Sequence, residues 1–374
     1  MIFFAPLGAG VNEENQWVDL WEINYTEIIT AMDKSENKKS IEEIGKFGLI
    51  SHLTENVKTG NKTTIKGIGD DSAIIDSGKN LTLVSTDLLL EGIHFNLIYT
   101  PLKHLGYKAV IRAISDIYAM NGTPGQVMIA LGISSKFNLE QVEDFYEGIS
   151  LACKKYHVDL VGGDITSSLT GMTIGVTSVG TVEKNKLVKR DGARANDLIC
   201  VTGDFGASFM GLQLLERERK LFVREKVTQP DLAGFEYVIG KQLKPEFPVS
   251  TLTELRKEEI TPTSMIDVTD GLASDLLQIC RLSDTCCRIF YSKVPIDYET
   301  SRLAEEFNID PITPALNGGE DFELLFTIPL GQAEKIKMIE SVKVIGHITS
   351  SGSGNYIVGD DGSEAEISAQ GWKA

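Results

Sequence analysis

The sequence predicts a mixed α/β (α+β) protein of two domains, and three observations lead to this fold class. Segments with β-branched residues and period-two alternation are interleaved with segments whose apolar residues recur at helical spacing. The chain of 374 residues is longer than one hydrophobic core usually serves. A charged run near the middle, KNKLVKRDGARAND, suits a domain junction. We therefore expect an N-terminal extension over 1–40, one domain over 41–185 and a second over 186–374.

The predicted elements follow one another in order along the chain. Residues 1–40 are polar, contain the charged patch MDKSENKKS and show no sustained apolar period, so we expect a disordered extension. In the first domain we predict helices at 41–53, 102–120 and 139–156. We predict a strand with a loop at 63–75 and further strands at 81–87, 158–164 and 172–182. The second domain is predicted to hold strand-to-helix units at 198–219 and 264–280, then strands at 323–329 and 343–348.

Charge and cysteine content exclude several classes of function. The formal net charge of −17 opposes the binding of nucleic acid, and phosphates would need divalent cations to approach the carboxylates. No stretch reaches the roughly 18 apolar residues of a membrane span, so we expect no membrane partner. Five cysteines without CxxC spacing indicate free thiols, which predicts a reducing, cytoplasmic location.

Aspartates recur at the predicted strand ends, each beside Gly, Ser or Thr. They are Asp70, Asp71, Asp87, Asp164, Asp267 and Asp270. A single one would be explained as a turn or helix-cap residue, but six clustered carboxylates need protons or hard cations. Asp116 adds an acid from a mostly apolar helix, where it is either exposed or directed at metal. Asp275 is expected to be structural or to support a metal ligand without binding the metal itself. Carboxylates with Ser or Thr hydroxyls are ligands that Mg²⁺ prefers, so the pattern predicts a magnesium site.

Other motifs narrow the chemistry further. Glycine-rich turns in GIGDD, VGGDIT, TGDFGAS and NGGED allow close backbone approach to an anion. The chain has no GxxxxGK[ST], no GxSxG and no HExxH, which disfavours P-loop, serine-hydrolase and zinc-protease chemistry. His94, close after the strand with Asp87, is the histidine best placed to reach a ligand.

Seven motifs in one order resemble the thiamine-monophosphate kinase family: GIGDDSA, STDLLLEGIHF, AISDIYAMNG, LVGGDIT, VKRDGARANDLICVTG, IDVTDGLASDL and NGGEDFELLF. The wider superfamily includes aminoimidazole ribonucleotide synthetase, selenophosphate synthetase and a hydrogenase-maturation enzyme. The resemblance implies a homodimer whose N-terminal sheet domains form a shared barrel, and a C-terminal α/β sandwich domain. It also implies that ATP and several Mg²⁺ ions lie in the cleft between the domains.

The resemblance also implies roles for individual residues. Metal ligands would be Asp71, Ser85, Thr86, Asp87, Asp116, Asp164, Asp267 and Asp270. ATP contacts would be Tyr146, Gly163, Arg190 and Thr269, and substrate contacts would be His94, Glu320 and Trp372.

The implied activity is direct in-line transfer of the γ-phosphoryl group of ATP to thiamine monophosphate, the last step of thiamine diphosphate biosynthesis. The acceptor oxygen belongs to a phosphate with a second pKa of about 6, so no side chain has to deprotonate it. This agrees with the lack of a candidate general base. Two alternatives stay open: an aminoimidazole ribonucleotide synthetase-like enzyme of the same superfamily, and a non-catalytic protein that binds Mg²⁺-nucleotide.

Overall fold

A computed structural model describes residues 41–225, 230 and 232–369 of the chain. The chain divides into two units, 1–44 and 45–374, and residues 41–44 are the described part of the first. Helix α2 (Ile41–Thr54) begins in the first unit, and all other helices and strands of the described residues belong to the second. The predicted extension and Trp372 lie outside the described residues.

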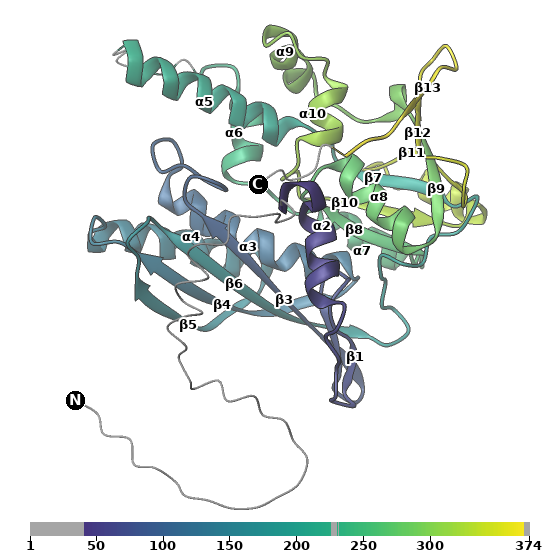
Figure 1. Cartoon of the computed structure of the whole chain (residues 1–374), viewed down its shortest axis with the longest axis horizontal. Helices are drawn as coiled ribbons and strands as arrows, with labels where there is room; N and C mark the ends of the chain where they lie inside the picture. Colours follow the sequence, from purple (N-terminus) through teal and green to yellow (C-terminus); the bar gives the residue numbers. More distant parts are fainter. Residues whose placement is uncertain (1–40, 226–229, 231, 370–374) are drawn as a thin grey trace, which may run out of the picture. The chain divides into compact units, whose positions relative to one another are not determined.

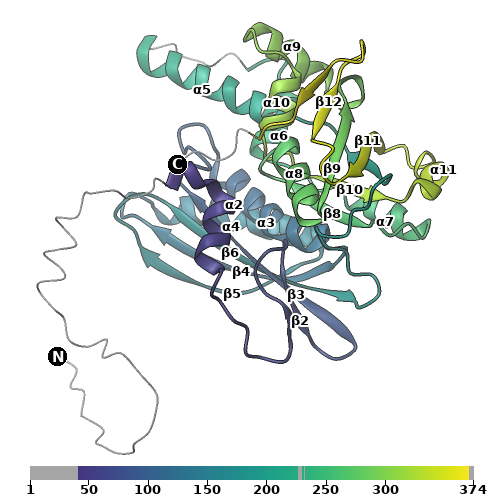
Figure 2. The same ribbon diagram turned by 45° about the vertical axis from the view of Figure 1, so that its right-hand side comes forward.

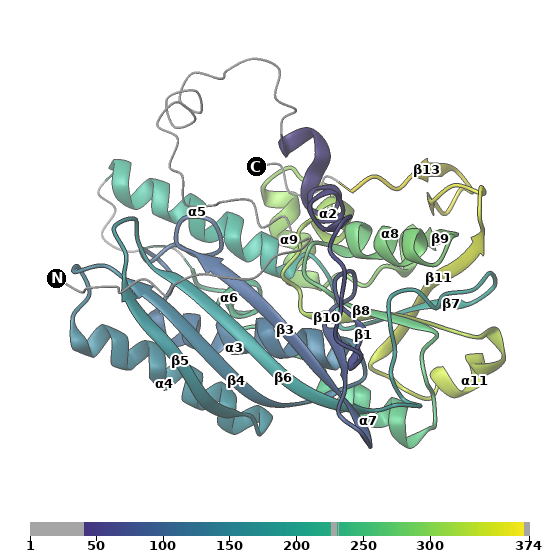
Figure 3. The same ribbon diagram turned by 60° about the horizontal axis from the view of Figure 1, so that its bottom comes forward.

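The first sheet has six strands in the order β1-β2-β3-β6-β4-β5. Their bounds are β1 (Thr64–Lys66), β2 (Ala73–Asp76), β3 (Asn80–Leu90), β4 (Thr123–Ile133), β5 (Asp159–Ser167) and β6 (Thr173–Glu183). All neighbours are antiparallel except β4 and β5. Figure 3 shows these strands in front of α3 (Leu102–Ala119) and α4 (Leu139–Tyr156), which cover one face of the sheet.

Two glycines let α3 and α4 pack closely against each other. A Cβ atom at Gly106 would lie 2.0 Å from the carbonyl oxygen of Phe145. A Cβ atom at Gly148 would lie 1.9 Å from the carbonyl oxygen of Lys103. Because each glycine faces the backbone of the other helix, any larger residue would push the two helices apart.

The other face of the first sheet carries exposed apolar side chains. Leu88 on β3 is 53% exposed and Met128 on β4 is 37% exposed. Thr86 lies on the same face, because it pairs with Thr177 and Thr177 pairs with Met128. We call this surface of β3, β6, β4 and β5 the open face.

The second sheet has seven strands in the order β13-β12-β9-β11-β7-β10-β8. Their bounds are β7 (Leu198–Thr202), β8 (Ser264–Val268), β9 (Thr285–Phe290), β10 (Glu323–Ile328), β11 (Val342–Ser350), β12 (Tyr356–Val358) and β13 (Glu364–Glu366). The α-helices of this part are α5 (Ala207–Glu225), α6 (Glu236–Leu243), α7 (Val249–Lys257), α8 (Leu272–Leu282), α9 (Tyr298–Glu306), α10 (Ile312–Asn317) and α11 (Ala333–Ile336). Figure 1 shows α8 and α10 on one side of this sheet.

Helix α3 lies between the two sheets. It packs on β3, β4 and β6 of the first sheet and contacts β8 at the edge of the second (Figure 2). One apolar core joins Ile111 of α3 to Ile129 of the first sheet and Leu324 of the second. This burial explains why the helix is apolar over most of its length.

The structure confirms the mixed α/β fold class. The six strands of the first sheet end at Glu183 and those of the second begin at Leu198, on either side of the expected boundary. The two-domain division itself stays a prediction. The expected end of a strand at Asp87 is wrong, because β3 continues to Leu90, and Asp164 likewise lies inside β5. Within the described residues, every helix is too short or too polar to cross a bilayer.

Candidate active site

Three carboxylates from three separate elements meet next to α3. Asp71 lies in the loop between β1 and β2, Asp116 on α3 and Asp267 on β8. One carboxylate oxygen of each lies within 4.8 Å of the others. Asp71 is 7% and Asp267 1% exposed, so water screens their charges poorly. We call these residues the acidic triad.

Polar side chains surround the acidic triad. The Arg190 guanidinium donates a hydrogen bond to Asp71, and the Ser85 hydroxyl donates one to Asp116. The Ser115 hydroxyl donates to Asp267 at 2.5 Å. The second carboxylate oxygen of Asp71 is buried and has no hydrogen-bond partner among the described residues.

Burial and mutual repulsion disfavour the charged forms of these acids. Burial raises the pKa of Asp71 to about 7, although Arg190 acts in the opposite direction. Burial, followed by the charges of Asp87 and Asp267, raises the pKa of Asp116 well above its usual value. Three clustered carboxylates with one arginine therefore need a proton or a hard cation.

A network of two acids and two cations adjoins the acidic triad. Arg112 on α3 donates to Asp87 at 3.0 Å and to Glu320 at 3.2 Å. Lys108, one helical turn earlier, donates to the other oxygen of Glu320 at 2.8 Å. Although burial opposes its charge, these two cations lower the pKa of Glu320. The second oxygen of Asp87 is buried without a partner in the described part of the chain.

The loop after β8 brings two more predicted residues to the site. Asp270 accepts a hydrogen bond from Lys46 of α2 at 2.5 Å. Asp275 accepts the backbone N–H groups of Thr269 at 3.1 Å and Asp270 at 3.2 Å. Asp275 therefore holds this loop, as expected for a structural residue.

Glu320 is held in an unusual backbone conformation. Its φ is 56°, and the φ of the preceding Gly319 is 72°, so two successive residues are left-handed. The N–H of Glu320 donates to the carbonyl of Thr269 at 2.9 Å, which fastens this turn to the end of β8. The strained turn thereby points the carboxylate of Glu320 toward Arg112.

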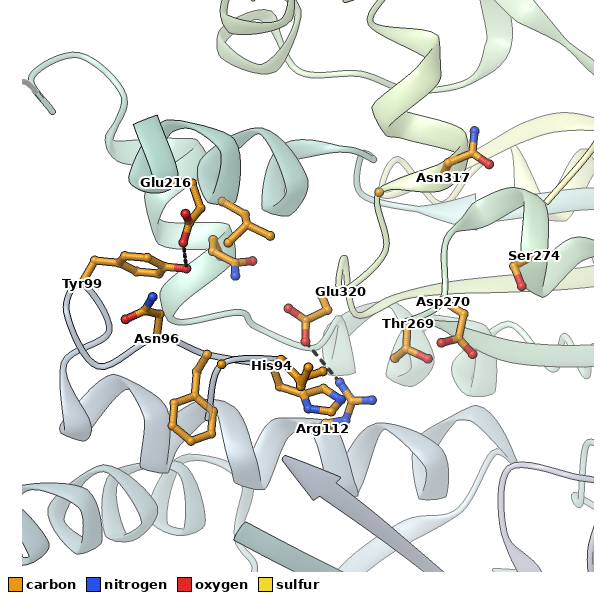
Figure 4. Close-up of a pocket in the computed structure, with 16 residues that line it drawn as sticks. His94, Asn96, Tyr99, Arg112, Glu216, Thr269, Asp270, Ser274, Asn317 and Glu320 are labelled. Atoms are coloured by element: carbon orange, nitrogen blue, oxygen red, sulfur yellow. Dashed lines mark hydrogen bonds and ion pairs between the residues drawn. The ribbon is translucent and has the colours of Figure 1, made fainter. Parts of the chain in front are cut away.

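A pocket of about 490 Å³ opens beside this network. Its lining includes His94, Arg112, Thr269, Asp270 and Glu320, and Figure 4 shows His94 and Arg112 next to Glu320. The Nδ1 atom of His94 accepts the N–H of Leu90 at 3.1 Å. Burial and then Arg112 lower the pKa of His94, so its imidazole is neutral at pH 7. The pocket can receive a ligand that reaches from the β3 side to the β8 loop.

Several predicted residues lie away from the acidic triad in this chain. Tyr146 lies on α4 and packs edge-on against Phe145. Gly163 and Asp164 lie on β5, and β6 and β4 separate this strand from β3. By register, Asp164 shares the open face with Leu88, whereas Asp87 points to the opposite face. The side chain of Thr86, on the open face, contacts Thr177 instead of the acidic triad.

Three cations of the site were missed by sequence reasoning: Lys46, Lys108 and Arg112. A pattern that could have revealed two of them is their spacing on α3, where Lys108, Arg112 and Asp116 follow at intervals of four residues. Such spacing places them on one helix face. They lie on a mostly apolar helix, where charged side chains are buried only when they are paired.

Comparisons with known proteins agree with this architecture. The family described as AIR synthase related protein, N-terminal domain, matches residues 69–182. A thiamine-monophosphate kinase of Aquifex aeolicus is 32% identical over 89% of this chain and 99% of its own length. One of Bacillus subtilis is 34% identical over 78% of this chain and 86% of its own.

Solved structures give the same result. AaThiL complexed with AMPPCP and TMP superposes with a TM-score of 0.75 and 31% identity, covering 90% of this chain and 99% of that one. The hydrogenase maturation protein HypE in complex with ATP, at 18% identity and a TM-score of 0.64, covers 88% of this chain and 98% of its own and shares the fold. The identity and coverage of these relatives show that the chain belongs to the thiamine-monophosphate kinase family.

Proposed function

We propose that this chain is a thiamine-phosphate kinase, which transfers the γ-phosphoryl group of ATP to thiamine monophosphate and forms thiamine diphosphate. One observation carries the proposal. The acidic triad and the pocket with His94 and Glu320 adjoin each other in a chain that is 32% identical to a thiamine-monophosphate kinase over 89% of its length. Solved relatives of the same fold include one complexed with AMPPCP and TMP.

The acidic triad suits Mg²⁺ as a resident cofactor. Its donors are hard carboxylate oxygens, and buried oxygens of both Asp71 and Asp87 have no partner among the described residues. Asp71, Asp87, Asp116, Asp267 and Asp270 would hold the ions, with the Ser85 hydroxyl supporting Asp116. Bound Mg²⁺ would supply charge neutralisation and orientation of the phosphates.

The remaining residues bind and position the two substrates. Arg190 places a fixed positive charge beside Asp71, where the phosphates of ATP would approach. Burial opposes this charge, but the contact with Asp71 raises the pKa of Arg190, so it stays protonated. Thr269 lines the pocket next to Asp270 and is proposed to contact ATP. His94 and Glu320 line the pocket too and are proposed to hold the acceptor.

This arrangement needs no general base. The acceptor oxygen belongs to a phosphate that is largely dianionic at neutral pH. Catalysis then consists of bringing two anions into line and balancing their charge. Since the clustered carboxylates are assigned to metal, thiamine monophosphate is a suitable acceptor and the alcohol group of thiamine is not.

The decisive experiment measures ADP release with Mg²⁺-ATP in the presence and absence of thiamine monophosphate. The proposal expects release that depends on thiamine monophosphate, with thiamine diphosphate as the second product. Nucleotide binding without any ADP release would indicate a non-catalytic Mg²⁺-nucleotide protein. Release that depends on a ribonucleotide amide and not on thiamine monophosphate would indicate an aminoimidazole ribonucleotide synthetase-like enzyme.

We also propose that the chain forms a homodimer through the open face of the first sheet. Supporting this, Leu88 and Met128 are exposed on a face that no described helix covers, and exposed apolar surface of this kind favours association. Thr86 and Asp164 would then face the second copy. Leu88→Glu should produce monomers in analytical ultracentrifugation, whereas Leu330→Glu, at an exposed position in the second sheet's part of the chain, should leave the dimer intact.

A cytoplasmic location is proposed on the state of the cysteines. All five are free and buried, which is typical of proteins kept in a reducing compartment.

A further inference from the structure

The pocket beside the acidic triad is lined by several acids and one strong cation. Among the described residues that line it, Arg112 is the one lysine or arginine, and the acids are Glu216, Asp270 and Glu320. A phosphate group that enters such a pocket is repelled by the carboxylates unless a cation offsets them. Arg112 is the protein group in this lining that carries the required charge at all physiological pH values.

The guanidinium of Arg112 is held in a fixed place but keeps free donors. Its Nε donates to Asp87 and its Nη1 to Glu320, at 3.0 and 3.2 Å. The side chain is 13% exposed, so it is buried on the α3 side and open toward the pocket. A guanidinium has five N–H donors, and those not used in these two bonds have no acceptor among the described residues.

The neighbouring lysine cannot take this role. Lys108 is 3% exposed, and its ammonium group donates to Glu320 and to the carbonyl of Gln242 at 2.9 Å. It does not line the pocket. Lys108 therefore offsets the charge of Glu320 from outside the pocket, and the remaining N–H donors of Arg112 stay available to a ligand.

We infer that Arg112 binds the phosphate group of the acceptor and so makes the pocket select phosphorylated thiamine over thiamine itself. This inference rests on the proposed function. Arg112 shares the pocket with His94 and Glu320, the proposed acceptor contacts, and Figure 4 shows all three together. Arg190, the other arginine proposed to bind a substrate, pairs with Asp71 and does not line this pocket. The planar fork of an arginine suits two phosphate oxygens at once.

The test compares the binding of two ligands that differ by the phosphate group. Thiamine monophosphate and thiamine are titrated calorimetrically into the wild-type enzyme and into Arg112→Gln, without ATP. We expect Arg112→Gln to lower the affinity for thiamine monophosphate by about 10- to 100-fold, which is the effect of losing a charged hydrogen bond. The affinity for thiamine should stay within about twofold of the wild-type value. The KM for ATP should stay within about twofold. Arg112→Lys keeps the charge but loses the planar fork, so its affinity for thiamine monophosphate should lie between those of the wild type and Arg112→Gln.

Arg288→Gln is the matched control, because Arg288 also pairs with a carboxylate, Glu364 at 2.9 Å, but lies outside the pocket. It should change neither affinity. Equal losses for both ligands in Arg112→Gln would overturn the inference, since they would indicate only a disturbed pocket. A raised KM for ATP with unchanged thiamine monophosphate affinity would also overturn it, and Arg112→Lys supplies the same test if Arg112→Gln does not fold. If the wild-type enzyme phosphorylates thiamine monophosphate but these variants bind it normally, the role of Arg112 is refuted and the proposed function stands. Wild-type enzyme without that activity refutes the proposed function as well.

Discussion

Replacing Asp116 by asparagine tests whether the acidic triad is built for a cation. Asparagine keeps the shape of the side chain and an oxygen that can accept the hydrogen bond from Ser85, but it removes one negative charge. The variant should therefore gain stability in metal-free solution and lose the stabilisation that Mg²⁺ brings. A residue with only a structural role would show neither effect.

The magnitude follows from the geometry of the acidic triad. Two unit charges 4.8 Å apart repel each other by about 3.5 kcal/mol at an effective dielectric constant of about 20. A proton can relieve this repulsion, and the pKa of Asp71, raised to about 7 by burial, limits the penalty in the metal-free protein to about 4 kcal/mol. Since Arg190 still pairs with Asp71, we expect Asp116→Asn to gain about 2–4 kcal/mol above that pH.

The direction of the pKa shift of Asp71 determines how the stability of the protein changes with pH. A carboxyl with a raised folded-state pKa keeps its proton in the folded protein where the unfolded chain has lost it. Stability is therefore lost as the pH rises from about 4 to about 7. Burial and the neighbouring carboxylates also raise the pKa of Asp116 well above its usual value, so the advantage of Asp116→Asn should grow as the pH rises through this window.

The assay is thermal unfolding followed by circular dichroism at about pH 5 and about pH 8, with chelator and with Mg²⁺. At roughly 2 °C per kcal/mol, metal-free Asp116→Asn should melt about 4–8 °C above the wild type at the higher pH. Saturating Mg²⁺ should raise the wild-type Tm by about 5 °C and the variant's by much less. Glu364→Gln, a carboxylate outside the site, is the control. An unchanged Mg²⁺ shift in Asp116→Asn, with no gain in metal-free stability, would refute the assignment.

Three further variants and one substrate test probe the other parts of the site. Asp87→Asn should lower kcat by about 10²- to 10³-fold with normal thermal unfolding, because the amide keeps its contact with Arg112 but loses the charge that holds Mg²⁺; wild-type rates at saturating Mg²⁺ would contradict this. His94→Gln should raise the KM for thiamine monophosphate more than it lowers kcat, as measured by ADP release, since its role is contact. Arg190→Gln should lower the free energy of unfolding in urea by about 3–5 kcal/mol without metal, because Asp71 loses its buried partner. Thiamine monophosphate should be phosphorylated quickly and thiamine hardly at all; comparable rates would indicate a base-assisted alcohol kinase.

Local signals explain why parts of the fold were predictable. Helix α4 has the predicted bounds of 139–156 because its start is marked in the sequence itself. Asn138 accepts the N–H of Gln141 at 2.9 Å, and Gln141 accepts the N–H of Asn138 at 3.1 Å. This capping box needs only residues that are near in sequence. The period of apolar residues then defines its buried face.

Strand β4 shows where such signals fail. Val127, Ile129 and Leu131 point into the core, but Met128 and Ala130 between them are apolar too. The alternation that marks a half-buried strand is therefore absent from the sequence. The same effect hid the end of β3, where apolar residues follow Asp87 on both faces.

The candidate site divides in the same way. The aspartates of the acidic triad could be named as candidates from the sequence because they stand in motifs that resemble a known family. Arg112 could not, because a lone cation on a helix is usually solvated. It becomes buried through Glu320, which lies 208 residues further along the chain. A contact of that length is decided by tertiary packing, and a single sequence does not reveal it.

Helix α3 fixes the distances between three charged residues of the proposed site. Lys108, Arg112 and Asp116 stand four residues apart, and each interval corresponds to about 6 Å along a helix axis. Arg112 is proposed to bind the acceptor and Asp116 to hold metal. The geometry of one helix, and not a loop, thus sets the separation between them. Rigid packing between two sheets keeps that spacing constant. Inserting one residue between Arg112 and Asp116 would turn one of them by about 100° away from the site, so donor and acceptor positions cannot be tuned independently.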